Sequence, residues 1–501
     1  MATRQFPSSE AQPVVTAAEM RAAERAYFAR GNDSYALMRK AGAAVADSIH
    51  QAHAGVDGEI LVLCGPGNNG GDGFVIADLL RRAGRPVSVT AMRAPESYTG
   101  DAGEAVKTWL DGGSVLPFDP AALPKAAIIV DALFGIGLDR PLEGKVATLI
   151  DWVNRSGADI WSVDIPSGIS ADDGRVLGTA IRAKHTVTFG WAKVGHLLLP
   201  GKIHCGRLEV APIGLEGDLL APNHATWRNA PSAWLSLLPQ PGPLDHKYSR
   251  GHALVIGSSD MPGAGRLAAL AARRIGAGML SVAAPAATLP LYMADQPGII
   301  ARPAARADDL VEILMDRRVS AVLVGSGLVP NAAAREAVIT GLAAGRPSVV
   351  DGGGLTAFAD RPDDLFTLGR GDIVLTPHDG EFARLFPDLG PELGKLARIR
   401  QAASRARSVI VLKGADSAIA APNGQVLIND AASPYLATAG SGDVLAGLIL
   451  GLLAQGMPAY QAAAAGVWFH AQAGLALGPG LIAEDLPGAI PGLLRDLDRP
   501  A

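Results

Sequence analysis

The sequence predicts an α/β protein with two three-layer domains, each a mostly parallel sheet between two layers of helices. Short apolar strand patterns alternate with helical segments along most of the chain, which is the element order of a parallel sheet covered on both faces. The length of 501 residues is enough for two to four domains. A proline-rich change in composition across 212–245 separates two such series of elements.

The composition excludes several classes of protein. With 49% hydrophobic and 19% charged residues, the chain is globular, and a net charge of -5 gives no footprint for nucleic acid or an anionic membrane. No apolar run reaches the length of a transmembrane helix. Residues 1–14 are expected to be a flexible tail rather than a signal peptide. Two distant cysteines, Cys64 and Cys205, predict neither a disulfide framework nor a structural zinc site and favour a reducing cytoplasm.

The first series begins with two helices across 16–53, broken at 31–33. Strands and helices then alternate, and the strand patterns cover 59–64, 87–90, 127–130 and 160–163, with helices at 74–83, 101–110 and 149–153. The first strand runs into the loop Gly-Pro-Gly-Asn-Asn-Gly-Gly-Asp-Gly at 65–73. Strand, glycine loop and helix place a phosphate on a helix N-terminus, although Asn-Gly and Asp-Gly are also ordinary turn formers. The density of Gly, Asn and Asp favours a ligand site.

Two further strands of this series end in an acid. Asp131 follows the strand 127–130, and Asp164 follows the strand 160–163. A single aspartate at a strand end is usually a turn or cap residue. Two of them beside the 65–73 loop are better interpreted as a site, because the carboxyl ends of parallel strands meet at one edge of the sheet, where ligands bind.

The second series repeats the alternation without a detectable repeat of the first sequence. Its strands are predicted at 253–257, 281–284, 321–324, 348–351, 373–376 and 409–412, with a helix at 267–277. It ends in the stretch 437–447, where the small-residue loop Ala439–Gly442 leads through Asp443 into an apolar helix, 444–453. Such a loop can bind phosphate, and the acid can take a proton from a hydroxyl. The alternative is an ordinary loop capped by Asp443.

The first half resembles the epimerase domain of NAD(P)HX repair proteins over roughly residues 15–215. The resemblance rests on the 65–73 loop, on Asp-Ala-Leu-Phe-Gly-Ile-Gly from Asp131 and on Asp-Ile-Pro-Ser-Gly from Asp164. It is supported by Thr188-Phe189-Gly190 with Lys193, Gly195 and Pro200-Gly201. Arg39 stands where this family usually has Glu, which we expect to affect a surface or subunit contact. The resemblance implies a Rossmann-like domain at 15–220 that epimerises hydrated NADH and NADPH.

The resemblance also implies particular roles for residues of the first half. Asp164 would be catalytic and contact the substrate, with Lys193 as a possible second polar group. A potassium ion would be ligated by Asn69, Asp131 and Ser167, and oxygen ligands suit such a hard cation. The hydrated dinucleotide would be cradled by Asn68, Asn69, Gly70, Gly71, Asp72, Gly135, Ile136, Gly137, Leu138, Asp139, Arg140 and Pro141.

The second half contains no GxxxxGK[ST] motif, so a P-loop does not explain it. Its element order is instead that of the ribokinase-like fold. His-Lys-x-x-x-Gly-His from His246, Met-Pro-Gly-Ala from Met261, Thr-Pro-His-x-Gly-Glu from Thr376 and Leu-Lys-Gly-Ala-x-Ser from Leu412 resemble the ADP-dependent NAD(P)HX dehydratase over roughly 245–495. We therefore expect a linker at 221–245 and a dehydratase domain at 246–501.

This second resemblance implies a catalytic Asp443. The contacts to the hydrated nucleotide would be Ala264, Gly327, His378 and Asp443, although a histidine after a proline is also a common turn residue. The contacts to ADP would be Lys413, Gly414, Ala415, Asp416, Ser417 and Gly442. Gly353 departs from the family, which usually has an acid at this position, and Gly-Ser-Ser at 257–259 replaces the more common Gly-Gly-Ser.

Together the two resemblances predict a bifunctional enzyme that repairs hydrated nicotinamide nucleotides. It would use NADHX, NADPHX and ADP, with K⁺ in the first domain and Mg²⁺ in the second, as a cytoplasmic homo-oligomer of four subunits or more without nucleic-acid or membrane partners. The rival interpretations are a vitamin or sugar kinase fused to a dinucleotide-sensing module, and a non-catalytic binding scaffold. The paired dehydratase motifs and the upstream epimerase motifs argue against the first, and the second predicts that Asp443→Ala leaves every activity unchanged.

Overall fold

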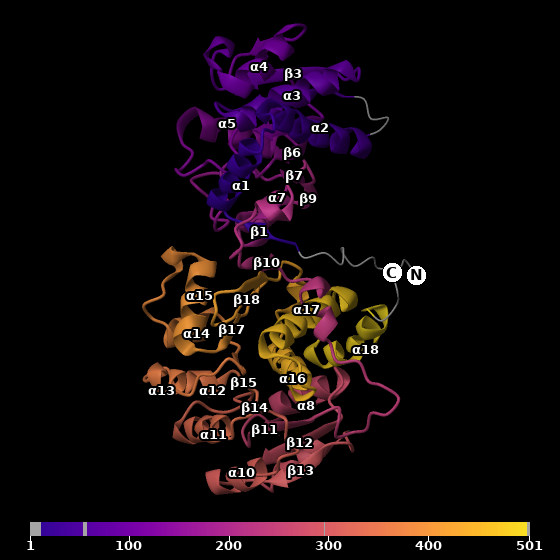
Figure 1. Ribbon diagram of the computed structural model, residues 1–501, viewed down its shortest axis with the longest axis vertical. Coiled ribbons are helices and arrows are strands. Elements are labelled where there is room, and N and C mark those ends of the chain that lie inside the picture. Colours follow the sequence, from indigo (N-terminus) through magenta and orange to yellow (C-terminus); the bar gives the residue numbers. More distant parts are fainter. Residues whose placement is uncertain (1–11, 54–57, 295, 498–501) are drawn as a thin grey trace. The chain divides into compact units, whose positions relative to one another are not determined.

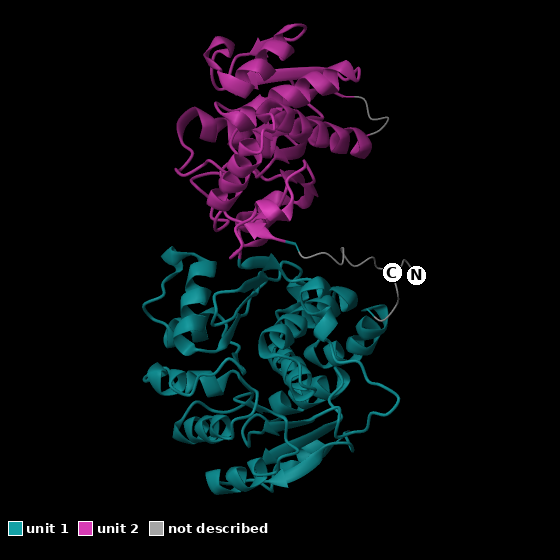
Figure 2. Ribbon diagram, viewed as in Figure 1, with its two compact units in different colours: residues 1–12, 225–501 teal, residues 13–224 magenta. Residues whose placement is uncertain are grey.

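The computed structural model describes residues 12–53, 58–294 and 296–497. The chain divides into two compact units, here named the N-terminal unit, residues 13–224, and the C-terminal unit, which consists of the residues from 225 onward together with Gln12 in the described part of the chain (Figure 2). Each unit contains its own sheet and its own hydrophobic core, which confirms the predicted α/β class. The flexible tail expected at 1–14 falls almost wholly outside the described residues.

The N-terminal unit is built on a sheet of seven strands in its described part, with the order β4-β3-β2-β5-β6-β7-β9 and parallel pairing throughout. A separate short pair, β1 and β8, lies outside this sheet. The elements are β1 Val14–Val15, α1 Ala17–Ala29, α2 Ser34–Ala52, β2 Ile60–Cys64, α3 Asn68–Arg82, β3 Val87–Ala91, α4 Gly100–Leu110, β4 Val115–Leu116, β5 Ile128–Ala132, α5 Gly144–Arg155, β6 Asp159–Val163, β7 His185–Phe189, β8 Ala192–Lys193, α6 Val194–Leu197, α7 Gly201–Cys205 and β9 Arg207–Ala211.

Alternation along the strands produces the three layers of this unit. In β2, Ile60, Val62 and Cys64 belong to a core shared with α2, α3 and α4, whereas Leu61 and Leu63 belong to a second core that includes α5. Successive side chains of a strand point to opposite faces, so an unbroken apolar run is buried on both sides. The order of the strands reverses at β2: β3 and β4 lie on one side of it, and β5 pairs with its other side. In such a fold a ligand is expected at the carboxyl ends of the two strands where the order reverses, here β2 and β5.

The C-terminal unit is built on a sheet that has ten strands among its described residues, in the order β10-β19-β18-β17-β16-β15-β14-β11-β12-β13. The elements are β10 Thr226–Arg228, β11 His252–Ile256, α8 Pro262–Arg274, β12 Met279–Ala284, α9 Leu289–Met293, β13 Ile300–Pro303, α10 Ala307–Leu314, β14 Ala321–Val324, α11 Ala332–Ala343, β15 Ser348–Val350, α12 Gly353–Thr356, α13 Pro362–Phe366, β16 Ile373–Leu375, α14 Asp379–Leu385, α15 Lys395–Ala406, β17 Val409–Leu412, β18 Ala418–Ala420, β19 Val426–Ile428, α16 Ser441–Ala454, α17 Ala459–Leu477 and α18 Leu486–Leu497.

Helices cover both faces of this sheet as well (Figure 1). One layer consists of α8, α16, α17 and α18, which form the main core with Ala253, Val255 and Val282 of the strands. The helices α10 to α15 lie on the other face. Pairing is parallel except where β18 meets β17 and β19. The order reverses between β11 and β14, so the crevice at their carboxyl ends is the expected ligand position.

Two local features differ from the sequence prediction. The helix expected to begin at Phe74 is α3, which begins at Asn68, so most of the predicted glycine loop forms the first turns of a helix. Glycine is a poor helix former, but packing outweighs propensity here, because Gly70 and Gly73 touch neighbouring backbone or side chains. Part of the segment predicted as a linker, 226–228, is β10, which pairs with β19. No helix in the described ranges is long and apolar enough to cross a membrane.

Candidate active sites

A buried carboxylate network lies where β5 and β6 end in the N-terminal unit. Asp131 belongs to β5 and is completely buried. It accepts hydrogen bonds from the Ser167 hydroxyl (2.6 Å) and amide (2.8 Å), the Ser162 hydroxyl (2.9 Å) and the Leu133 amide (3.3 Å). Burial raises the pKa of Asp131, and these four neutral donors oppose the rise. Within the described part of the chain, no ion pair compensates this carboxylate.

The surroundings of Asp131 fit a monovalent cation. Asp131, Ser167 and Asn69 offer oxygen atoms, which hard cations prefer. Asn69 Nδ2 is buried and has no hydrogen-bond partner among the described residues; as a donor it would be satisfied by an acceptor atom of a ligand, whereas only Oδ1 of this amide can bind a cation. A cation held by these three side chains would supply the positive charge that Asp131 otherwise lacks.

Asp164 lies at the end of β6 in an unusual backbone conformation. Its φ of 65° is left-handed, which costs energy for a residue with a side chain and is typical of functional sites. One carboxylate oxygen accepts hydrogen bonds from Lys193 Nζ (2.8 Å) and the Thr188 hydroxyl (2.9 Å), and the other accepts from the Ile136 amide (3.3 Å). His196 accepts from the Lys193 amide through Nδ1 (2.9 Å), so its Nε2 donates to the Asp164 carbonyl (2.8 Å). The strained residue is therefore held at both its side chain and its backbone.

The carboxyl groups around this site have opposite tendencies to ionise. Burial raises the pKa of Asp164, but Lys193, with His196 and Thr188, outweighs burial and leaves that pKa below its usual value. Burial, followed by the Asp164 and Glu24 carboxylates, raises the pKa of Asp72 well above its usual value. Burial and Asp164 also raise the pKa of Glu24. The site therefore combines an ionised Asp164 with acids that favour the protonated form.

Glycines allow the loops of this site to approach one another. A Cβ atom on Gly65 would lie 1.6 Å from the Leu133 carbonyl oxygen, and one on Gly70 would lie 2.0 Å from the Gly65 carbonyl oxygen. A Cβ on Gly135 would lie 3.1 Å from Asp164 Oδ2 and 3.2 Å from Asn69 Oδ1. The structure thus brings Asn69, Gly135 and Asp164 together. Residues 68–72 lie at the start of α3, and 135–141 form the loop after β5, of which Asp139, Arg140 and Pro141 are exposed.

In the C-terminal unit, polar groups gather at the carboxyl ends of β15, β16 and β17. The buried Asp351 accepts hydrogen bonds from Lys413 Nζ (2.8 Å) and the Thr376 hydroxyl (2.6 Å). Lys413 Nζ also lies 3.8 Å from the Glu381 carboxylate. Burial lowers the pKa of Lys413, but Asp351, Glu381 and then Asp443 raise it above its usual value. A permanently charged ammonium group is therefore held among three carboxylates.

Asp443 is in the first turn of α16, whose N-cap is Gly440 with φ of 87°. Burial and the Asp351 carboxylate raise the pKa of Asp443 to about 6, against the opposing effects of Ser326 and Lys413. A Cβ on Gly442 would lie 3.5 Å from Lys413 Nζ, so the ammonium group sits beside the N-terminus of α16. Free backbone N–H groups and a neighbouring lysine form a suitable site for a phosphoryl group.

The proposed contacts to the hydrated nucleotide come from separate segments. Gly327 has φ of 76°, and a Cβ on it would lie 3.1 Å from Ala264 Cβ, so these two predicted residues are in contact. His378 caps α14, where its Nδ1 accepts from the Gly380 amide (2.9 Å), and more than half of its side chain is exposed. The cap uses Nδ1 and leaves Nε2, which lies 3.7 Å from the Glu381 carboxylate, so the turn role is compatible with a ligand contact.

The loop that follows β17 is held by its own hydrogen bonds. The Gly414 amide donates to the Ser417 hydroxyl (3.0 Å), which in turn donates to the Gly414 carbonyl (2.7 Å). Asp416 accepts from Lys395 Nζ (2.5 Å). This arrangement keeps Lys413, Gly414, Ala415, Asp416 and Ser417 together in one turn at the edge of the Asp443 site.

Several residues at these sites carried no clear signal in the sequence. Lys193 was considered only as a minor polar group, yet its side chain is entirely buried against Asp164. Glu24 and His196 were not expected at all. His470 of α17 hydrogen-bonds the Ser441 hydroxyl (2.9 Å), and burial lowers the pKa of His470 to about 4. Thr188 and Lys193 belong to one motif, whereas Glu24 and His470 lie far in sequence from the residues they affect, as His196 does from Asp164.

The departure at Gly353 has a steric explanation. A Cβ at this position would lie 1.8 Å from the Leu328 carbonyl oxygen. The loop that carries Gly327 therefore occupies the space that a side chain at position 353 would need.

Fold and sites together define the class: a two-unit α/β enzyme in which each parallel sheet carries a carboxylate-based site at its carboxyl edge. Residues 252–482 match the family described as NAD(P)H-hydrate dehydratase, and residues 34–195 match the family described as YjeF-related protein N-terminus. The chain is 38% identical to a bifunctional NAD(P)H-hydrate repair enzyme of Moorella thermoacetica, over 97% of each chain. It is also 38% identical to one of Thermosynechococcus vestitus, over 92% of each. The chain belongs to the family of bifunctional NAD(P)H-hydrate repair enzymes.

Among solved structures, the C-terminal half is similar to the ADP/ATP-dependent NAD(P)H-hydrate dehydratase of Bacillus subtilis, which was co-crystallised with ATP and Mg²⁺. The identity is 29%, the TM-score is 0.46, and the match covers 52% of this chain and 94% of that chain.

Proposed function

We propose that the N-terminal unit interconverts the R and S epimers of hydrated NADH and NADPH, and that the C-terminal unit dehydrates the S epimer with ADP, releasing AMP and phosphate. The family of the chain supports this proposal. The observation that carries it is the arrangement of Asp443, Lys413 and the N-terminus of α16 at one sheet edge.

In the dehydratase reaction, Asp443 takes the proton from the C6 hydroxyl of the hydrated nicotinamide ring. The hydroxyl oxygen then bonds to the terminal phosphorus of ADP, and the bond from that phosphorus to AMP breaks. Lys413 and the backbone N–H groups of Gly440–Gly442 stabilise the charge on the transferred group. Phosphate then leaves C6 and a proton leaves C5, so that the C5–C6 double bond of the dihydronicotinamide forms again. A base with a pKa of about 6 suits this role, since it is ionised at neutral pH.

The carboxylates at this site fit Mg²⁺ in company with ADP. The described residues contain no group of three or more His, Cys, Asp or Glu side chains arranged to hold a metal ion by themselves. Mg²⁺ is commonly held by one or two carboxylates together with substrate phosphates. Asp351 and Glu381, both buried near Lys413, could supply these oxygen atoms. When bound, the ion would neutralise phosphate charge.

In the epimerase reaction, Asp164 and Asp72 have complementary roles. The protonated carboxyl of Asp72 gives a proton to the C6 hydroxyl as the C6–O bond breaks, and the ring nitrogen forms a double bond to C6. Water then adds to the other face of C6 and gives a proton to Asp164. The opposite directions of the two pKa shifts support this assignment. Asn69, Asp131 and Ser167 would hold K⁺, and the glycine loops at 65–73 and 135–141 would cradle the nucleotide.

Other features of the proposal concern the cell rather than the chemistry. We place the protein in the cytoplasm, because Cys64 and Cys205, both among the described residues, are buried free thiols. A homo-oligomer of four subunits or more stays a prediction.

The direct test supplies purified protein with S-NADHX and ADP and follows the absorbance band of the dihydronicotinamide. We expect the band to return, with one AMP and one phosphate formed for each NADH. The Asp443→Asn variant should lose this activity while it still epimerises R-NADHX. If neither ADP nor ATP restores the band, the dehydratase assignment is wrong. Phosphate transfer to a vitamin or sugar alcohol would instead support the rival kinase interpretation.

A further inference from the structure

The strand order leaves one direction for the distal half of the dinucleotide. Around Asp443, Asp351 follows β15, Ser326 follows β14, and Lys413 follows β17. The ADP loop proposed above lies on the β17 side of this centre. A substrate with its nicotinamide ring at Asp443 therefore has β14, β11 and β12 on the side away from the ADP loop.

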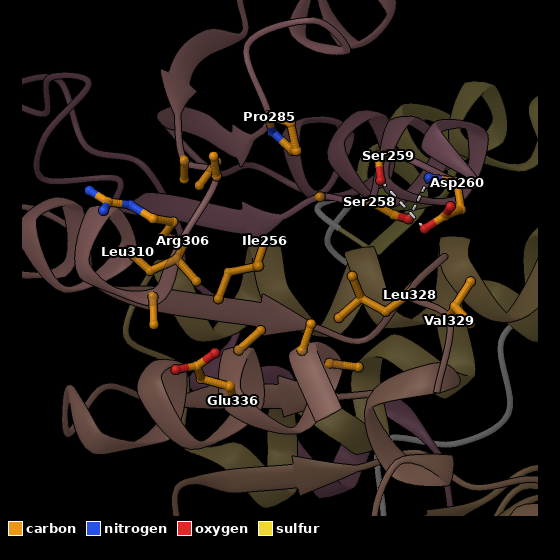
Figure 3. A pocket seen from close by; sticks show the side chains of 18 of the residues that line it. Ile256, Ser258, Ser259, Asp260, Pro285, Arg306, Leu310, Leu328, Val329 and Glu336 are labelled. Carbon is orange, nitrogen blue, oxygen red and sulfur yellow. Dashed lines mark hydrogen bonds between the residues drawn. The ribbon is translucent and has the colours of Figure 1, made fainter. Parts of the chain in front are cut away.

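A cavity of about 200 Å³ lies at the carboxyl ends of these strands. Figure 3 shows Ser258, Ser259 and Asp260 at one end, Arg306 and Glu336 at the other, and the side chains of Ile256 and Leu328 between them. The remaining lining is mostly alanine, contributed by α10, α11 and the ends of β12 and β13. The cavity occupies the point where the strand order reverses, between β11 and β14.

Short segments connect this cavity to the proposed reaction centre. Ser326 acts on the ionisation of Asp443, Gly327 packs against Ala264, and Leu328 lines the cavity. Two residues of chain span at most about 7 Å, so the cavity begins within the reach of a dinucleotide bound at Asp443. On the other wall, Asp260 of the cavity is followed directly by the Met261–Ala264 segment.

We propose that this cavity binds the adenosine half of the hydrated dinucleotide. The inference rests on the proposed dehydratase function and specifies where the non-reacting end of its substrate lies. Cavities for whole drug-sized ligands measure about 300–1,000 Å³, so about 200 Å³ suits one nucleoside base. Ile256, Leu328 and the alanines offer apolar surface for a flat purine.

The polar groups of the cavity suit the sugar rather than the base. Asp260, at the end of the cavity that adjoins the Met261–Ala264 segment, carries a carboxylate that can accept hydrogen bonds from ribose hydroxyls, as acids do in other dinucleotide sites. The Ser258 hydroxyl oxygen is already engaged within the loop, because it accepts a hydrogen bond from the Asp260 amide (3.0 Å). Arg306 is the one cation among the described lining residues, and its ion pair with Asp309 is long, at 3.8 Å.

The test compares the full substrate with one that lacks the proposed occupant. Ala337→Phe would fill the cavity from α11, and Ala343→Trp, on an exposed position of the same helix outside the cavity, is the matched control. Each protein is supplied with ADP and either S-NADHX or the S hydrate of reduced nicotinamide mononucleotide, which has no adenosine. Epimerase activity and circular dichroism verify that both variants are folded.

We expect Ala337→Phe to raise KM for S-NADHX by roughly tenfold, which corresponds to the loss of one well-packed group, while kcat stays close to that of the unsubstituted protein. KM for the truncated hydrate should not change, and the control should match the unsubstituted protein with both substrates. Equal changes with both substrates, or no change with S-NADHX, would overturn the assignment of the cavity. If the unsubstituted protein converts neither hydrate, the proposed function itself is refuted, and the cavity assignment with it.

Discussion

Replacing Asp443 with Asn should increase the stability of the C-terminal unit while it abolishes dehydration. Burial and Asp351 raise the pKa of this carboxyl from 3.8 to about 6. A shift of about two units corresponds to about 3 kcal/mol against the ionised form in the folded protein. Asp443 is partly exposed, so solvent screening reduces this cost to about 1–3 kcal/mol. The amide also loses a favourable interaction with the N-terminus of α16, about 0.3–1 kcal/mol.

The net gain for Asp443→Asn is therefore about 0–3 kcal/mol, centred on about 1–2 kcal/mol, and it depends on pH. Because the folded pKa is above the unfolded value, the ionised carboxylate destabilises the fold fully at pH above about 6. The cost decreases as pH falls below about 6 and disappears below the unfolded value of 3.8, where the carboxyl is protonated in both states. Dehydratase kcat should fall by about 10²–10⁴-fold, the usual contribution of a general base.

The assay combines urea unfolding with initial rates. Free energies of unfolding for the C-terminal unit are measured for Asp443→Asn and the unsubstituted protein at pH 8 and near pH 4. The variant should be more stable at pH 8 and equal near pH 4, and the dehydratase rate of the unsubstituted protein should decline below about pH 6. A variant that is less stable at pH 8, or a rate without an acid limb, would refute the reasoning.

The remaining predictions concern both units. Asp164→Asn should slow epimerisation by about 10²–10³-fold in kcat without changing dehydration, and equal loss of both activities would show that the units do not act independently. Lys193→Met should leave the buried Asp164 carboxylate unpaired, at a cost of about 3–5 kcal/mol in unfolding free energy. It should also shift the acid limb of the epimerase pH profile to higher pH, because the pKa of Asp164 rises without the ammonium group. Lys184→Met, at an exposed lysine, is the control. Gly353→Asp should lower the thermal midpoint and the dehydratase rate, because its Cβ meets the Leu328 carbonyl, and an unchanged midpoint would contradict this. Chelation of Mg²⁺ should stop dehydration but not epimerisation.

The sequence predicted the fold class because apolar runs record burial directly. The strands predicted at 59–64 and 409–412 agree with β2 and β17 within a residue, and the strand predicted at 127–130 agrees with β5 within two. The start of α3 was predicted six residues too late, since Asn68–Gly73 consists of residues that favour turns in isolation. Their helical conformation depends on close packing against the nearby Gly65 and against Met38 and Ala132, which are distant in sequence.

The sites were predicted only where their residues lie at strand or helix ends. Asp131, Asp164 and Asp443 lie at such ends and were identified. Glu24 was not, because it comes from α1 and reaches Asp164 only through the fold. Lys193 gave a weak signal, since a lysine is exposed far more often than buried. The predicted ligand contacts stay predictions, which the substitutions above test.

One measurement tests the central claim most directly: a time course that starts from pure R-NADHX and ADP. We predict that the protein converts all of the R epimer to NADH, with one AMP and one phosphate for each NADH, because epimerisation supplies the S form to the C-terminal unit. Asp164→Asn should stall with R-NADHX remaining, and Asp443→Asn should stop at a mixture of both epimers. If the unsubstituted protein leaves the R epimer untouched and forms no NADH, the account of a two-site repair enzyme is contradicted.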